Sequence, residues 1–178
     1  MDFDRYYELL QKRSNTCKVN PIQFCQRHGI TLQEFNQHRA SFVALLNSKL
    51  NHIKDIVDLK ITDITTNGFG LNNIHSVRDF YHYYYYYFFF KSRALLVKRD
   101  NFDCCRHQYI KDRLNLLITP HTNDPALNWL THKFDTYEEL RIQADYKFDD
   151  SSINDLVKPQ TIQDAVGIDW ADLQGITI

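Results

Sequence analysis

Apolar side chains recur at helical spacing along residues 1–50 of the chain. A helix predicted over Asp4–Lys12 places three of them on one face, Tyr6, Leu9 and Leu10. A second short helix is predicted over Ile22–His28. A third begins after Thr31 and carries one apolar face, formed by Phe35, Phe42, Leu45 and Leu46. The pattern therefore predicts a helical head at the start of the chain.

Capping and turn residues mark the boundaries of the second and third helices. Asn20 is a favoured N-cap, and Pro21 suits the first helical position, where its missing N–H is not needed. Gly29 suits the left-handed position that follows a helix end. Thr31 and Glu34 have the spacing of a capping box. Two short helices joined by a Gly-centred turn form a helix-turn-helix, which we predict for the head.

Residues 51–71 have a less regular pattern and are predicted to connect the head to the body. Four apolar residues suggest a further turn of helix, Ile53, Ile56, Val57 and Leu59. The stretch Leu59–Ile64 includes β-branched residues and allows a short strand instead. Asn67–Gly70 contains two glycines and predicts a break in the helical pattern.

The body is assigned to residues 72–150, and its most unusual stretch is the aromatic run Tyr81–Phe90. Aromatic residues favour strands, but the surrounding segment Val77–Lys98 suits a helix and contains no Gly or Pro. We predict a helix buried on several sides, against its own domain or a second copy. Stacking of RNA bases on one or two exposed tyrosines is the alternative. A later helix begins at Asp124-Pro125 and carries an apolar stripe, formed by Leu127, Leu130, Phe134, Tyr137 and Leu140.

Composition favours a helical chain and limits the attraction of nucleic acid. The chain has 5 glycines and 4 prolines among its 178 residues. Because these turn-forming residues are few, an all-α fold is predicted. The net charge of -1 provides no overall basic field, and nucleic-acid contact requires a local patch. Residues 1–50 carry seven Lys or Arg against four Asp or Glu, a net of +3. From Asp145 onward seven aspartates face two lysines, a net of −5. The acidic C-terminal tail, residues 151–178, is expected to pack on the body or to bind a partner.

The four cysteines indicate a reducing environment. Vicinal Cys104 and Cys105 do not form an unstrained disulfide, and the remaining spacing is no disulfide framework. They also lack the two-residue gap of structural zinc sites, so no metal site is expected. Met1–Arg13 is charged throughout and Tyr83–Phe90 is too short to span a bilayer. A cytoplasmic protein with no membrane segment is the expectation.

The head resembles the small helix-turn-helix of insertion-sequence transposition proteins over Phe24–Ile30, followed by Phe35 and Arg39. The resemblance implies that the second helix enters a DNA major groove. The residues then expected to contact nucleic acid are Arg27, Gln33, Asn36, Gln37 and Arg39. The alternative is a helical hairpin that packs on the body or on a partner, because helix-turn-helix geometry alone does not give function.

Three ordered elements of the body resemble the HEPN superfamily of small helical proteins. The first element is a helix with Tyr-Tyr, Phe, Arg and Ala-Leu-Leu, here Tyr85, Tyr86, Phe89, Arg93, Ala94, Leu95 and Leu96. The second is a His that opens the next helix, here His107. The third is a signature Arg followed in one branch by Ala-Asp-Tyr, here Arg141 and Ala144–Tyr146. The resemblance implies an antiparallel helical bundle of HEPN type.

The resemblance also implies a chemistry. HEPN ribonucleases place an Arg and a His one helical turn apart on a helix that faces its copy across a dimer, and they need no metal or cofactor. The His moves a proton at the ribose 2′-OH or the leaving oxygen, and the Arg holds the scissile phosphate. In this chain Tyr146 occupies the position of that His, and a phenol is a poor base at neutral pH. The candidate catalytic residues are Arg141, Asp145, Tyr146 and His107, and His132 is the second histidine considered, besides His107, for the Arg141 cleft.

Two functions follow from these features. The first is a HEPN-like, metal-independent endoribonuclease or toxin-like effector of a toxin–antitoxin or anti-phage defence system. It would act on RNA as a homodimer or in a larger defence complex, restrained by an antitoxin or a partner nucleotidyltransferase. The second is a non-catalytic module that assembles, or binds DNA or RNA through the helix-turn-helix head.

Overall fold

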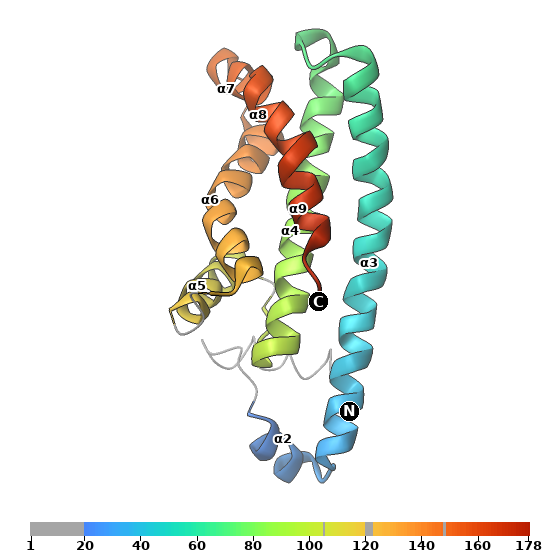
Figure 1. Cartoon of the computed structure of the whole chain (residues 1–178), viewed down its shortest axis with the longest axis vertical. Coiled ribbons are helices and arrows are strands. Elements are labelled where there is room, and N and C mark those ends of the chain that lie inside the picture. Colours follow the sequence, from blue (N-terminus) through green and yellow to red (C-terminus); the bar gives the residue numbers. More distant parts are fainter. Residues whose placement is uncertain (1–19, 105, 120–122, 148) are drawn as a thin grey trace. The chain divides into compact units, whose positions relative to one another are not determined.

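The structure is a computed structural model that describes residues 20–104, 106–119, 123–147 and 149–178. Its described residues contain helices and no strand, so the chain is an all-α helical bundle, as predicted. The helix predicted over Asp4–Lys12 lies outside the described residues. The α-helices are α2 (Pro21–His28), α3 (Leu32–Asn67), α4 (Ile74–Asp100), α5 (His107–Ile118), α6 (Pro125–Tyr146), α7 (Asp150–Leu156), α8 (Pro159–Asp164) and α9 (Trp170–Gly175) (Figure 1).

The helices form two compact units. The described residues of the first unit come from Met1–Leu50, Phe89–Thr122 and Ile178, and those of the second from Asn51–Phe88 and Asn123–Thr177. The long helices α3 and α4 each contribute one part to each unit. A short 3-10 helix, Leu71–Asn73, precedes α4, and a π-helical turn, Ala165–Asp169, lies between α8 and α9.

The caps of α2 and α3 have the predicted geometry. The Asn20 side chain accepts hydrogen bonds from the backbone N–H groups of Ile22 and Gln23 at 3.0 and 3.2 Å. Gly29 ends α2 in the left-handed region at φ 62°. The Glu34 carboxylate accepts from the Thr31 N–H at 2.7 Å, and the Glu34 N–H donates to the Thr31 hydroxyl at 3.2 Å. The Thr31 N–H and the Thr31 hydroxyl both donate to the Glu34 carboxylate, and they lower the pKa of Glu34 because they stabilise its charged form.

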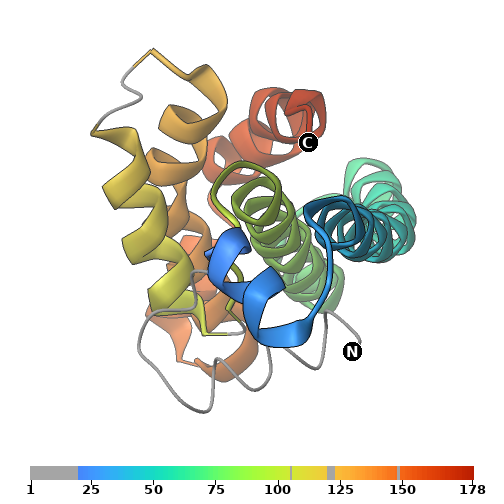
Figure 2. The ribbon, with the colours of Figure 1, turned by 90° about the horizontal axis from the view of Figure 1, so that it is seen from below.

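The first unit has its own hydrophobic core where α2, α3 and the end of α4 meet. The core consists of Phe24, Phe35, Phe42, Leu46, Ala94 and Val97. Figure 2 shows α2 beside the first residues of α3 and the last residues of α4. Asn101 has a φ of 52°, and the backbone N–H of Phe102 after it donates to the Leu96 carbonyl at 3.3 Å, so the chain turns sharply after α4.

The stretch assigned to a connector is helical, because α3 continues without a break to Asn67. The strand that the sequence allowed at Leu59–Ile64 is therefore wrong. No Gly or Pro interrupts residues 51–67, and Val57 and Ile64 are buried one heptad apart. The Thr62 hydroxyl donates to the Asp58 carbonyl at 2.9 Å, which accommodates a β-branched residue within the helix. The break predicted at Asn67–Gly70 is present, since Gly68 has a φ of 83°.

The aromatic run is helical and lies within α4, as predicted. Within the second unit, Phe80, Tyr81, Tyr84, Tyr85 and Phe88 are at most 1 % exposed. The apolar stripe of α6 packs against them: Phe134 meets Phe88 edge-on at a ring-centroid distance of 5.5 Å, and the Tyr84 and Tyr137 rings lie 4.4 Å apart. In the described ranges, no helix combines the length and apolar character needed to cross a membrane.

The acidic tail packs on the second unit. Trp170 is 5 % exposed and its ring contacts Tyr84 and Tyr87, while its indole N–H donates to Asp58 at 3.0 Å. Asp169 is 7 % exposed, pairs with Lys133 at 2.8 Å, and accepts a hydrogen bond from the Tyr137 hydroxyl. The buried carboxylate therefore has two polar partners, which offset the cost of removing its charge from water.

Candidate functional site

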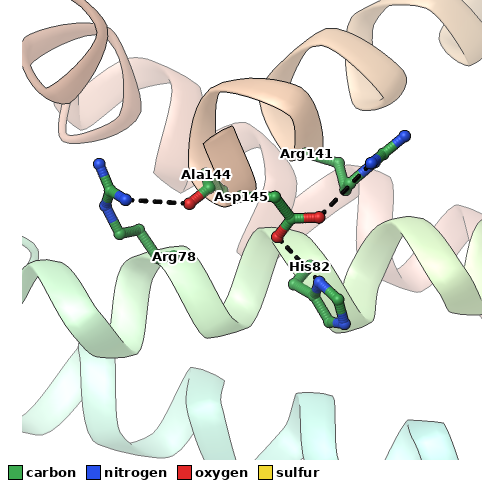
Figure 3. Close-up of polar contacts among 5 residues, drawn as sticks. All are labelled: Arg78, His82, Arg141, Ala144 and Asp145. Atoms are coloured by element: carbon green, nitrogen blue, oxygen red, sulfur yellow. Dashed lines mark hydrogen bonds and ion pairs between the residues drawn. The ribbon is translucent and has the colours of Figure 1, made fainter. Parts of the chain in front are cut away.

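The end of α6 is fixed against α4 by Arg78 within the second unit. The Arg78 guanidinium donates to the Ala144 carbonyl at 3.1 Å (Figure 3). It also donates to the Lys147 carbonyl at 2.6 Å. The last carbonyls of a helix lack intrahelical partners and carry partial negative charge, so a cation suits this place. This anchor sets the position of the last two turns of α6, which carry Arg141, Asp145 and Tyr146.

Arg141 is buried, with 9 % of its surface exposed. Its guanidinium carbon lies 5.3 Å from the centre of the Tyr85 ring and 5.6 Å from that of the Tyr146 ring. Two aromatic faces near a guanidinium stabilise its charge. They do not satisfy its N–H donors, and the buried Nε atom has no hydrogen-bond partner among the described residues. Such a donor is unusual in a folded protein, because leaving it unpaired is costly.

The Asp145 carboxylate contacts two basic side chains, Arg141 and His82. One carboxylate oxygen lies 3.5 Å from Arg141 Nη1, a long and weak contact, and the other lies 2.8 Å from His82 Nδ1. The side chain of Asp145 is 17 % exposed, so the Arg141–Asp145 pair is not the exposed ion pair that its spacing on a helix suggests. Figure 3 shows that His82 comes from α4 and approaches Asp145 from the side opposite Arg141.

His82 was not among the residues predicted for the site. Its side chain is 37 % exposed, and its ring contacts Tyr86 and Tyr83 at 4.8 and 5.0 Å. One sequence signal pointed to it: His82 is the one residue in Tyr81–Phe90 that is neither Tyr nor Phe. A polar side chain retained in such a run needs a polar partner, and that partner is Asp145 on the neighbouring helix.

The other candidate catalytic residues lie in different surroundings. Tyr146 is 69 % exposed, so its ring has one face toward Arg141 and much of its surface open to solvent. His107 begins α5, as the sequence predicts, and belongs to the first unit, where its ring packs against Phe89 at 4.4 Å. His132 is exposed on α6 and its Nδ1 lies 2.7 Å from the Asn128 carbonyl. A catalytic role of His107 stays a prediction.

The nucleic-acid candidates of the head are mostly exposed in the first unit. Arg27 lies on α2, and three amides lie on the first turns of α3, Gln33, Asn36 and Gln37. Arg39 differs from them, because it is half-buried and donates to the Asn101 side chain at 2.8 Å. Arg39 therefore has a structural partner that the sequence did not indicate.

No cluster of three or more His, Cys, Asp or Glu side chains that could hold a metal ion occurs within the part of the chain that the structure describes. Comparison of the chain with protein-family models, with curated proteins and with solved structures finds no match. Any functional assignment therefore rests on the residues and on the geometry of the site.

Proposed function

We propose that the chain is a HEPN-like, metal-independent RNA endonuclease that acts as a toxin-like effector in a toxin–antitoxin or anti-phage defence system. The observation that carries the proposal is Arg141, a 91 % buried arginine with an unpaired Nε, on the helical turn that the family motif predicts. A buried donor without a partner is explained if a ligand supplies the acceptor. For a guanidinium that ligand is an oxyanion, and a phosphodiester fits it.

RNA suits this site because it carries its own nucleophile. The 2′-oxygen next to the scissile phosphate attacks phosphorus, and the 5′-oxygen leaves, which gives a 2′,3′-cyclic phosphate and a free 5′-hydroxyl. The transition state carries more negative charge on its equatorial oxygens than the diester does. Arg141 is held near that position by Tyr85 and Asp145, so its N–H donors stabilise the added charge without reorganisation.

The proposed partners follow from the family resemblance. The active form would be a homodimer or part of a larger defence complex, in which a second copy brings another Arg141 to the same RNA. An antitoxin or a nucleotidyltransferase would restrain the activity between infections. The exposed Tyr146, adjacent to Arg141, is the residue through which such a partner would reach the site.

The proposal is tested by incubating the purified chain with a single-stranded RNA of mixed sequence in excess EDTA. We expect endonucleolytic fragments with 2′,3′-cyclic phosphate and 5′-hydroxyl ends, identified by mass spectrometry. An RNA in which every ribose is 2′-O-methylated is the matched control and should stay intact, because it has no nucleophile. Intact unmodified RNA, or fragments with 5′-phosphate ends, would contradict the proposal.

A second candidate function is nucleic-acid binding by the helix-turn-helix head, favoured by the exposure of Arg27 and of three amides on α3. If the head binds a duplex, Arg27→Ala should weaken the gel shift and reduce its salt dependence by about one unit of slope. Arg39→Ala is the informative comparison, since Arg39 already pairs with Asn101 and its loss should also lower stability. Equal shifts by the parent and Arg27→Ala would count against this function.

A further inference from the structure

The proposed reaction requires a proton acceptor for the ribose 2′-OH. Tyr146, at the motif position of the family His, is poorly suited to this task, since a phenol is protonated at neutral pH. Arg141 is permanently charged and only donates. Asp145 has one oxygen against His82 and the other near Arg141. The remaining group with a suitable atom is the imidazole of His82.

We propose that His82, on α4, is the general base of the site and that Asp145 orients it; this inference rests on the proposed ribonuclease function. The Asp145 carboxylate can only accept a hydrogen bond, so the ring nitrogen 2.8 Å from it, Nδ1, carries the hydrogen. The neutral imidazole then has its lone pair on Nε2. A carboxylate that fixes the tautomer of a catalytic histidine in this way also stabilises the imidazolium formed when the base takes a proton.

The geometry leaves Nε2 open for a substrate. Figure 3 shows the second ring nitrogen of His82 pointing away from Asp145. The side chain is 37 % exposed, and none of the described residues forms a hydrogen bond with Nε2. The rings of Tyr83 and Tyr86 on the same helix limit the rotation of the imidazole. The base is therefore both oriented and accessible.

In this arrangement the Asp145 carboxylate contacts both the proton acceptor, His82, and the phosphate-binding group, Arg141. His82 Nε2 takes the proton of the 2′-OH, the 2′-oxygen bonds to phosphorus, and the bond from phosphorus to the 5′-oxygen breaks. The imidazolium returns its proton through solvent to the departing 5′-oxygen, so the fragments form without any net consumption of acid or base. Arg141 holds the phosphate during this exchange. The chain thus compensates for the His missing at position 146 with a His from a different helix.

The first test measures single-turnover RNA cleavage by His82→Ala and His82→Gln. Both should lose about a hundredfold or more in rate, which is the usual contribution of a general base. His82→Gln keeps an N–H donor for Asp145 but cannot take a proton, so it separates chemistry from structure. Both variants should bind the 2′-O-methylated RNA within about threefold of the parent, since Arg141 is intact. The matched control is His52→Ala, an exposed histidine on α3 that the site does not include, which should cleave at the parent rate.

Two further readouts report on proton transfer itself. Added imidazole should restore part of the activity of His82→Ala and none of that of Arg141→Ala. The parent rate should rise with pH, because the base acts only when neutral. That rise should disappear in His82→Gln.

The charged and titratable groups that face His82 are Asp145 and, beyond it, Arg141 from α6, with Tyr83 and Tyr86 on α4. Asp145→Asn, a change in a positioning residue, should lower the rate and alter this pH profile.

The outcomes separate the two proposals. Parent-like cleavage by His82→Gln would overturn the role of His82, and so would equal losses of cleavage and of RNA binding in both His82 variants. In either case the ribonuclease function still stands if Arg141→Ala is inactive. A large loss in His52→Ala would assign the proton transfer elsewhere and would also overturn the role of His82. Intact RNA with the parent chain would remove the ribonuclease function, and the role of His82 with it.

Discussion

Replacing Arg141 by alanine should lower the rate of RNA cleavage by about a hundredfold or more, which is the typical loss when one preorganised charge donor is removed from a transition state. Among the described residues, the buried guanidinium has an Nε without a hydrogen-bond partner and a long contact of 3.5 Å from Nη1 to Asp145, so hydrogen-bonding capacity is left for a ligand. Cleavage of a fluorescently labelled RNA, followed under single-turnover conditions, measures the effect.

Two variants control for folding and for charge. Arg141→Lys keeps the positive charge but lacks the planar fork, and its rate should fall between those of the parent and Arg141→Ala. Arg106→Ala removes an exposed arginine at the start of α5 and should leave the rate unchanged. Helical content by circular dichroism should match the parent in each case. Parent-like cleavage by a folded Arg141→Ala would show that the arginine takes no part in the reaction.

Phe134→Ala should destabilise the second unit by about 3–5 kcal/mol, the usual cost of truncating a fully buried phenylalanine. Phe134 is 0 % exposed and its ring lies edge-on to Phe88 and Tyr85 at 5.5 and 6.2 Å. The variant loses both the apolar burial and these ring contacts, and rigid neighbours on α4 prevent the cavity from closing. Urea unfolding followed by circular dichroism gives the difference in free energy of unfolding.

The controls for this prediction differ in burial and in size. Phe134→Leu fills most of the same space and should lose less than Phe134→Ala. Leu116→Ala truncates a residue that is 62 % exposed on α5 and should change stability by less than about 0.5 kcal/mol. A loss below about 1 kcal/mol for Phe134→Ala would mean that the aromatic cluster is not the tightly packed core described above.

Local features of the fold were predictable because they depend on neighbouring residues. The capping of α2 by Asn20, the capping box of Thr31 and Glu34, and the N-cap of α6 by Asp124, which accepts from the Leu127 N–H at 3.1 Å, each involve residues within three positions. The buried stripe of α6 follows from its 3.6-residue period and is also confirmed.

Features that depend on distant residues were missed. The β-branched residues of 51–67 suggested a connector, but the segment is helical and buries Val57 and Ile64 one heptad apart. The spacing of four residues on one helix pairs Asp145 with Arg141, but a one-dimensional pattern cannot show that α4 brings His82 to the other carboxylate oxygen. The docking of the acidic tail likewise depends on Tyr137 and Lys133, which are more than thirty positions from Asp169.

The central claim is that Arg141 and His82 act on a phosphate next to a ribose 2′-OH. Its most direct test is a DNA oligonucleotide that contains a single ribonucleotide, incubated with the chain in excess EDTA. We predict one cut, directly 3′ of the ribonucleotide, that leaves a 2′,3′-cyclic phosphate and a 5′-hydroxyl, and no cut in the all-DNA strand. An uncut oligonucleotide under conditions that cleave all-RNA, a cut at a deoxynucleotide, or a cut that requires a divalent metal would contradict the claim.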